Sequence, residues 1–424
     1  MQTSTSSTSN VLSDSNTASV PLVVSKTSNT AESEPQKDSQ NVVQKADSHS
    51  ELENLTQNAA ARDKALWQKK KPSTLEYLTY ALSQCGRSPF SVLREYSKLS
   101  RGQGRMTFPE YVQFGLYDPD MPFERKQRFI SNKTHWPITH KCCDMTWQAT
   151  TEDKWLCSRI LKESSVPVPE TLAVVDKTNR IYPGTITLSN AEEFREFALE
   201  HRGLSLFGKE NRGMAGFGVF LIDEIEEQRL HLKGEGWIEY ESFFDKYIGN
   251  EGYLIQPAQR NHAFFEKYTD GLATVRVCIL VTDAGIRIPF AVLKLPARDQ
   301  IADSFWRSGN LACKLDPATG KILDARTKSP LGTESFENCP SSGEPLVNET
   351  LPQWEQLLDL VHDCAPIFSS VRYQSMDVAI TDEGPKLIEI NTGGGFDLPQ
   401  LASGEGFLTD EVIEFFKSHG CKGF

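Results

Sequence analysis

The sequence predicts an α+β fold, in which separate helices accompany strands that are mostly joined by hairpins. Two observations support this prediction. Apolar residues recur at helical spacing between residues 67 and 135, and short apolar and β-branched runs separated by turns follow from Leu204. Helices in one region and hairpin-linked strands in another are typical of the α+β class.

Composition divides the chain into three parts. Its 424 residues are enough for two or three packed subdomains. Residues 1–66 contain no Phe, Trp or Tyr and are rich in Ser, Thr, Asn and Gln, so we expect a disordered tail that cannot bury enough apolar surface to fold. Residues 67–135 are expected to form a helical N-terminal region, and residues 136–424 to form the domain that carries the chemistry.

Charge and hydropathy narrow the classes of function. A formal net charge of −12 argues against nonspecific binding to nucleic acid or to an anionic membrane. No apolar run is long enough to span a membrane, and those near the N-terminus are too short for a signal-peptide core. We therefore expect small-molecule partners, with no nucleic acid and no membrane span.

The nine cysteines are scattered without CxxC spacing, which predicts reduced thiols and a cytoplasmic location. The segment "HKCCD", from His140 to Asp144, offers residue types that can bind a metal. Adjacent cysteines chelate poorly, however, and buried thiols are the favoured interpretation of this segment.

Cap and stop residues delimit the predicted helices of the N-terminal region. The segment "STLEYLTYALSQCG" has Ser73 or Thr74 as its N-cap and Gly86 as its stop. The segments "SPFSVLREYSKLSRG" and "FPEYVQFGLYD" follow in the same manner. Further on, "EDKWLCSRILKESSVPVPETLAVV" predicts a helix, a proline-bounded turn and a strand.

Strands dominate the later part of the chain. They follow the helix "SNAEEFREFALEHRG", in which Ser189 and Glu192 form a capping box and Gly203 ends the helix. The predicted strands are "LSLFGK", "FGVFLID", "GYLIQP", "LATVRVCILVT", "RIPFAVLKL", "ACKLD" and "KILDA". An amphipathic helix "WEQLLDLVHDCAPIF", a hairpin "YQSMDVAI-TDEG-PKLIEIN" and a final amphipathic helix "LTDEVIEFFKSHG" complete the pattern.

The second strand of this last hairpin ends with polar residues and then runs into three glycines. Because side chains alternate along a strand, Leu387, Glu389 and Asn391 are expected on one face and Ile388 and Ile390 on the other. A carboxylate and an amide at the end of an otherwise apolar strand suit a cation. A solvated sheet face is the alternative interpretation.

The turn of the same hairpin sets its predicted register. A three-residue turn ending at Gly384 pairs Thr381 with Pro385 and so places Asp377 opposite Glu389. Two carboxylates and the amide two residues further on then share one face. Oxygen ligands of this kind suit Mg²⁺, with nucleotide phosphates completing the shell.

The segment "FGKENRGMAGFGVFLID" predicts a phosphate-binding loop between two strands. Its glycines, Gly213, Gly216 and Gly218, read G-x-x-G-x-G, which is neither the dinucleotide fingerprint nor a Walker A motif and argues against a dehydrogenase. A glycine-rich hairpin can still close over phosphates, with Lys209 as a point charge beneath it. An ordinary turn is the alternative.

The segment "LATVRVCILVTDAGIRIPFAVLKLP" carries two cations within apolar strands. A three-residue turn pairs Thr282 with Ile286, which makes Arg276 and Lys294 diagonal neighbours on one face. Two like charges side by side indicate an anionic ligand. A lysine that reaches the sheet edge with its charged end is the alternative.

The order of these segments resembles the ATP-grasp superfamily, specifically its sugar-transfer-associated group related to α-L-glutamate ligases, over roughly residues 105–415. The resemblance implies two α+β subdomains that grip ATP. It also implies that Lys154, in "EDKWLCSRILKESSVPVPET", and Lys209 contact the nucleotide, and that the loop from Arg212 through Gly213 and Gly216 to Gly218 covers the phosphates.

The remaining motifs complete the implied site. "YLIQPAQRNHAF" resembles the hinge strand, whose backbone at Gln256, Pro257 and Ala258 would meet the adenine. "TVRV" and "AVLKLP" resemble the strands that carry the catalytic Arg276 and Lys294. "MDVAI" and "LIEIN" resemble the segments that hold Mg²⁺, which implies Asp377, Glu389 and Asn391 as its ligands.

Three positions depart from the family pattern. Pro257 stands where the hinge usually carries a glutamate, and Asn261 and Glu266 are the candidate ribose partners. An arginine directly upstream of the metal aspartate is missing, since Gln374 and Ser375 stand there. We expect Arg276 to take that role.

The sequence therefore predicts an ATP-dependent ligase with ATP and Mg²⁺ as cofactors. The resemblance implies that a carboxylate attacks the γ-phosphate to give an acyl phosphate and ADP, and that an amine or sugar-linked acceptor then attacks. A kinase built on the same ATP site, or an ATP-binding regulatory module without turnover, are the alternatives.

Overall fold

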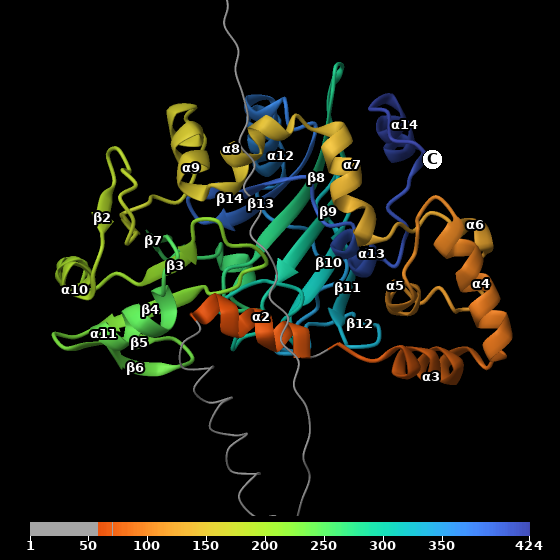
Figure 1. Cartoon of the computed structure of the whole chain (residues 1–424), viewed down its shortest axis with the longest axis horizontal. Helices are drawn as coiled ribbons and strands as arrows, with labels where there is room; N and C mark the ends of the chain where they lie inside the picture. Colours follow the sequence, from red (N-terminus) through yellow and green to blue (C-terminus); the bar gives the residue numbers. More distant parts are fainter. Residues whose placement is uncertain (1–57, 70) are drawn as a thin grey trace, which may run out of the picture. The chain divides into compact units, whose positions relative to one another are not determined.

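The computed structural model describes residues 58–69 and 71–424 (Figure 1). The prediction of a disordered tail lies outside the described residues for residues 1–57. Within the described part, helices precede, separate and follow two seven-stranded sheets, so the predicted α+β class is confirmed. No described helix is long and apolar enough to cross a bilayer.

Short helices make up the region before the first sheet. They are α2 (Ala59–Lys69), α3 (Thr74–Cys85), α4 (Pro89–Arg101), α5 (Phe108–Gln113), α6 (Phe123–Lys126), α7 (His135–Cys142), α8 (Gln148–Glu152) and α9 (Lys154–Glu163), with 3₁₀ turns η1 (Asn132–Thr134) and η2 (Met145–Trp147). The caps of α3 are as predicted: Ser73 and Glu76 form a capping box, and Gly86 ends the helix in the left-handed conformation.

Helix α2 begins inside the segment that composition predicted to be disordered. The side-chain oxygen of Asn58 accepts the N–H of Ala61 at 2.9 Å, which caps the helix. Ala59 is buried in the core of the first sheet, and Arg62 lies over the ring of Tyr247 at 4.9 Å. For residues 59–66 the prediction of disorder is wrong, because a capped helix with one apolar contact face needs no aromatic residue of its own.

The first sheet has the strand order β2-β1-β7-β3-β4-β5-β6 and is antiparallel except between β1 and β2. Its strands are β1 (Ala173–Val175), β2 (Ile186–Leu188), β3 (Leu206–Glu210), β4 (Phe220–Ile225), β5 (Arg229–Leu232), β6 (Gly236–Glu239) and β7 (Tyr253–Pro257). Helices α10 (Ala191–Glu200) and α11 (Tyr240–Phe243), with the π-turn η3 (Phe244–Ile248), pack their aromatic side chains into its core.

The predicted caps of α10 are shifted. Asn190, not Ser189, is the N-cap, because its side chain accepts the N–H of Glu193 at 2.9 Å. Glu193 in turn accepts from the backbone N–H of Ser189 at 2.6 Å. The helix ends at Glu200, before Gly203.

The second sheet has the order β12-β11-β10-β9-β8-β13-β14. Its strands are β8 (Thr274–Thr282), β9 (Gly285–Leu295), β10 (Leu311–Leu315), β11 (Ile322–Lys328), β12 (Thr333–Ser335), β13 (Tyr373–Thr381) and β14 (Gly384–Thr392). Helices α12 (Trp354–Cys364), α13 (Asp397–Ser403) and α14 (Asp410–Ser418), with turns η4 (Ala263–Phe265) and η5 (Ala365–Phe368), complete the chain. Side chains from α9, α12, α14 and this sheet form the largest apolar core.

A bulge corrects the register of the last hairpin. The turn is one residue tighter than predicted, because Thr381 pairs with Gly384 and not with Pro385. An extra residue in β14, Ile388, then shifts the pairing by one, so Asp377 lies opposite Glu389 as predicted. The hairpin of β8 and β9 does the same, with a tighter turn and an irregularity beside Pro289, whose missing N–H cannot join the ladder.

The bulge also changes which side chains share a face. Leu387 is buried in the apolar core with Ile390, and Ile388 is not part of that core. The prediction that Leu387 shares a face with Glu389 is therefore wrong, since the extra residue interrupts the alternation between them.

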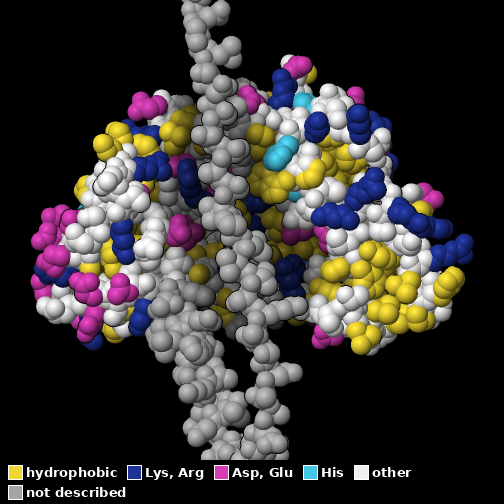
Figure 2. Space-filling model, in the orientation of Figure 1, with side chains coloured by type: hydrophobic (Ala, Val, Ile, Leu, Met, Phe, Trp, Pro, Cys, Tyr) yellow, Lys and Arg dark blue, Asp and Glu magenta, His cyan; other side chains and the backbone are white. Residues whose placement is uncertain are grey.

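Hydrophobic side chains are visible on the surface over α3 and α4 (Figure 2). Leu75 and Phe90 are 71% and 76% exposed there, although Tyr77, Val92 and Tyr111 form a buried core beneath.

The bulge gives a matched pair of stability tests. We expect Ile390→Gln to lower the free energy of unfolding by about 2–4 kcal/mol, because it buries an amide in the core of the second sheet. Ile388→Gln, two residues along the same strand, should cost less than about 1 kcal/mol. Urea denaturation measures the free energy of unfolding of both variants. Equal losses would contradict the assignment of Ile390, and not Ile388, to the apolar core.

Candidate active site

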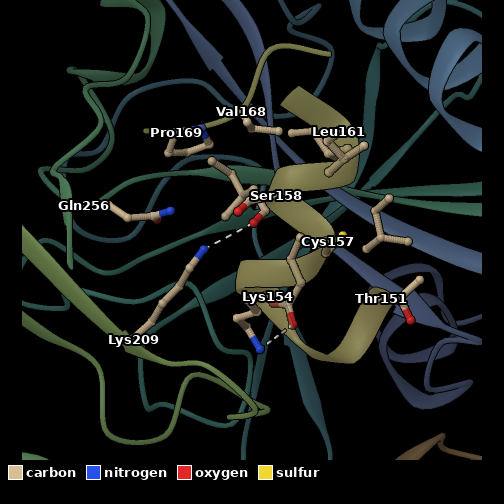
Figure 3. A pocket seen from close by; sticks show the side chains of 13 residues that line it. Thr151, Lys154, Cys157, Ser158, Leu161, Val168, Pro169, Lys209 and Gln256 are labelled. Atoms are coloured by element: carbon tan, nitrogen blue, oxygen red, sulfur yellow. Dashed lines mark hydrogen bonds and ion pairs between the residues drawn. The ribbon is translucent and has the colours of Figure 1, made fainter. Parts of the chain in front are cut away.

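Residues from both sheets and from helix α9 line one pocket (Figure 3). Gln256 of β7 and Lys209 of β3 point from the first sheet toward α9, which carries Lys154, Cys157 and Ser158. The second sheet contributes the bulged part of β14, from Leu387 to Ile390. The pocket therefore lies where the predicted nucleotide lysines and the predicted metal strand meet.

The two lysines reach the same strand from opposite directions. Lys154, at the first position of α9, lies 3.1 Å from a carboxylate oxygen of Glu389 and donates to the carbonyl of Gly213 at 2.5 Å. Lys209 donates to the carbonyl of Ile388 at 3.3 Å. The bulge turns that carbonyl away from the ladder, so it is free to accept.

Burial lowers the pKa of Lys209 to about 8, although the nearby carboxylate of Glu389 opposes the shift. The side chain is 9% exposed and has a carbonyl, not a carboxylate, as its hydrogen-bond partner. A buried ammonium held this weakly is suited to an anionic ligand.

The glycine-rich loop is held by other parts of the chain. The carbonyl of Gly216 accepts from Arg307 at 3.1 Å, and the N–H of Gly218 donates to Asp63 of α2 at 3.0 Å. Both glycines have positive φ, and so does Ala215 directly before Gly216. Arg212 is 74% exposed and lies 3.8 Å from Asp153, outside the pocket lining.

The predicted hinge is the end of β7. The side chain of Gln256 is buried and donates to Thr171 at 3.1 Å, and Pro257 is the last residue of the strand. The N–H of Ala258 donates to the carbonyl of Ser205 at 2.8 Å, so it is already used within the protein.

The two candidate ribose partners lie just beyond the hinge. Asn261 bonds to the backbone of Gly271 and Ala273 at 2.7 and 2.9 Å and so shapes the loop before β8. Glu266 directly follows the turn η4 and does not line the pocket.

The candidate metal face carries two carboxylates and one amide. Asp377 lies opposite Glu389, and Asn391 pairs with Ser375 two residues further along the ladder. The buried amide nitrogen of Asn391 and the hydroxyl of Ser375 have no hydrogen-bond partner among the described residues. Two carboxylates and an amide oxygen are donors of the hardness that Mg²⁺ prefers, so this donor set fits Mg²⁺.

The protein alone does not supply a full coordination shell. Among the described residues no group of three or more His, Cys, Asp or Glu side chains is arranged to hold a metal ion. Two carboxylates and one amide therefore require further ligands, which phosphate oxygens would provide.

Asp377 is the centre of a buried cluster of charges. Arg276 donates to both of its oxygens at 2.5 and 2.6 Å, and Lys294 lies 3.1 Å from it. Burial would raise the pKa of Asp377, but the two cations outweigh it and hold that pKa far below its usual range. The predicted closeness of Arg276 and Lys294 is therefore observed, with a carboxylate between them.

Asp303 completes this cluster, and no feature of the sequence points to it. Its carboxylate lies 3.0 Å from the ammonium of Lys294 and accepts from the hydroxyl of Thr274. It stands in the loop between β9 and β10, where no motif or periodicity marks a single acid. Only the folded loop brings it to the sheet.

The cysteines of the segment "HKCCD" are buried thiols, which is the favoured interpretation of this segment. Cys142 and Cys143 are buried, and the sulfur of Cys142 lies 4.0 Å from that of Cys421. All nine cysteines lie within the described residues, and none forms a disulfide.

Comparison with solved structures finds ATP-binding ligases and carboxylases at low similarity. D-alanine–D-alanine ligase from Bacillus anthracis matches at 12% identity and TM-score 0.36, over 65% of this chain and 69% of that one. D-alanyl-alanine synthetase A from Vibrio cholerae matches at 14% identity and TM-score 0.38, over 65% and 67%. Biotin carboxylase from Campylobacter jejuni, in its βγ-ATP complex, matches at 12% and 0.36, over 72% of this chain and 53% of its own.

A family model also matches the chain, over about two thirds of its length. The model for sugar-transfer associated ATP-grasp proteins matches residues 139–414, and no curated protein matches the sequence. The chain belongs to the sugar-transfer associated ATP-grasp family, and its fold is the ATP-grasp fold that the resemblance implied.

The lowered pKa of Lys209 predicts proton uptake when nucleotide binds. At pH 8 about half of these side chains are neutral in the free protein, because the pKa is about 8. Phosphate oxygens would raise that pKa, so binding of Mg·ATP should take up a fraction of a proton at pH 8 and almost none at pH 6. Calorimetry in buffers of different ionisation enthalpy measures this uptake.

Lys162→Met is the matched control, because Lys162 lies in the last turn of α9 and does not line the pocket. It should leave the proton uptake unchanged, whereas Lys209→Met should remove it. Uptake that survives in Lys209→Met would show that another group titrates.

Proposed function

We propose that this protein is an ATP-dependent ligase that activates a carboxylate as an acyl phosphate for attack by an amine or a similar nucleophile. One observation carries the proposal: Lys154 and Lys209 converge on the strand that bears Glu389 and Asn391, beside the Arg276–Asp377–Lys294 cluster. Membership of the ATP-grasp family supports ATP as the cofactor. The oxygen donors on β13 and β14 support Mg²⁺.

The proposed reaction has two steps. A carboxylate oxygen of the substrate attacks the γ-phosphorus, the bond from that phosphorus to the β-phosphate oxygen breaks, and ADP leaves. The nucleophile then attacks the acyl carbon, phosphate leaves with the bonding electrons, and the nucleophile loses a proton. Mg²⁺ bound by Asp377, Glu389 and Asn391 would offset charge on the transferring phosphoryl group.

The chain's own residues supply positioning and charge. Lys154 and Lys209 would orient the phosphates, and the loop from Arg212 to Gly218 would exclude water from the acyl phosphate. If Asp377 held the metal, Arg276 would be free to hold the phosphoryl group or the substrate carboxylate. Such an exchange of partners would give a reason for the convergence of two cations on one carboxylate.

Partners and location follow from the same chemistry. We propose a small carboxylate donor and an amine or sugar-linked acceptor. The reduced state of nine cysteines supports a reducing compartment, and we propose the cytoplasm.

A screen for ADP release tests the reaction class. The protein should convert Mg·ATP to ADP over many turnovers only when a suitable carboxylate and a nucleophile are both present among mixed amino acids, amines and acidic sugars. ADP release that needs a hydroxyl compound and no carboxylate would replace the proposal with a kinase. Tight binding of Mg·ATP without ADP release under any mixture would replace it with a regulatory module.

The metal face gives the sharpest single substitution. Glu389→Gln keeps the shape of the side chain and removes a charge that the cation needs, so turnover should fall by about two to four orders of magnitude. Folding should survive, because Glu389 is about a quarter exposed and Lys154 is its one ion-pair partner among residues 58–69 and 71–424. Turnover and the melting temperature are measured together.

Glu383→Gln is the matched control, because Glu383 lies at the exposed tip of the same hairpin and pairs only with Lys386. It should leave turnover within about twofold of the unmodified protein. Full activity in Glu389→Gln would show that Glu389 does not bind the metal.

A further inference from the structure

The loop between β9 and β10 touches the charged cluster of the second sheet. Lys294 lies between two carboxylates, 3.1 Å from Asp377 and 3.0 Å from Asp303. Thr274, opposite Lys294 on β8, donates its hydroxyl to Asp303 and so orients the carboxylate toward the ammonium. Asp303 and Lys294 are 18% and 8% exposed, so the pair is largely shielded from water.

The same loop is fixed on its other side by the glycine-rich loop. Ser304 and the indole N–H of Trp306 both donate to the carbonyl of Ala215 at 2.7 Å. The ring of Trp306 lies 5.2 Å from that of Phe217. Asp303 is therefore held by Thr274 and Lys294, and the residues that follow it are held by the glycine-rich loop. These contacts fix the carboxylate beside the lysine.

The charges of the cluster show why a second carboxylate is needed. Arg276, Lys294, Asp377 and Asp303 carry two positive and two negative charges and are balanced in the free protein. If Asp377 becomes a metal ligand, Lys294 loses one of its two partners. A buried ammonium without a carboxylate partner is costly, so the Lys294 side chain would move from this position.

We propose that Asp303 is a positioning residue that keeps Lys294 in place when Asp377 turns from that lysine to the metal. The inference rests on the proposed function, since it assigns Asp377 to Mg²⁺. Asp303 touches neither the metal nor the nucleotide in this arrangement and acts only through Lys294.

The reactivity of Lys294 toward an acetylating reagent tests the proposal without nucleotide. Asp377→Asn removes the other carboxylate, so Asp303 alone then holds the ammonium. Acetylation by N-hydroxysuccinimide acetate, followed by mass spectrometry, should be as slow at Lys294 in Asp377→Asn as in the unmodified protein. Adding Asp303→Asn should make it about tenfold faster. Equal rates with and without Asp303 would overturn the proposal.

Asp324→Asn in the same Asp377→Asn background is the matched control. Asp324 lies on β11 with similar exposure, 24%, and pairs with Arg326. It should leave acetylation of Lys294 slow. If the Asp377→Asn background does not fold, because it leaves Arg276 without its carboxylate, Asp303→Asn and Asp303→Glu in the otherwise unmodified protein decide through kcat. A lowered kcat that Asp303→Glu restores supports the positioning role, whereas an unchanged kcat in Asp303→Asn overturns it.

Kinetics separates this inference from the proposed function. In a protein that is active, Asp303→Asn should lower kcat by about ten- to a hundredfold and leave KM for ATP unchanged. A change in KM alone would overturn the positioning role. A protein that binds no Mg·ATP would contradict the proposed function. The acetylation comparison would still test the role of Asp303, because it uses no nucleotide.

Discussion

The ion pair between Arg276 and Asp377 is the interaction on which the site depends. It joins β8 to β13 with two charge-assisted hydrogen bonds inside a sheet whose other face is apolar core. Removing one member of such a buried pair typically costs about 3–5 kcal/mol, because the other charge is left without a partner. Lys294 contacts the same carboxylate at 3.1 Å, so the side chains that stabilise the sheet are also those of the candidate site.

Two different means hold positive charge in the pocket. In the second sheet, cations are balanced by carboxylates and become available only by exchange of partners. In the first sheet, Lys209 has only a carbonyl partner and tolerates burial through its lowered pKa. A polyanion that enters between the sheets would therefore meet Lys209, which can gain a proton, and Arg276, which can exchange its carboxylate partner.

Much of this arrangement could be predicted from the sequence, because it depends on local pattern. The glycine-rich loop and the two lysines that meet at β14 follow from motif order. Asp303 could not be predicted, because a single acidic residue in a loop belongs to no repeating pattern. Its partner, Lys294, is brought near only by the fold. The start of α2 was missed because composition averages over the few residues, Asn58 and Ala59, that cap and anchor it.

The opposition of Asp377 to Glu389 was predicted through a turn that is not there. A tighter turn and a bulge at Ile388 each shift the pairing by one residue, and the shifts cancel. The hairpin of β8 and β9 shows the same cancellation. In both hairpins the irregularity in pairing therefore separates the register at the turn from the register at the charged ends of the strands. A residue gained or lost at either tip can be absorbed at the bulge, so the turns are free to vary in length while the site keeps its geometry.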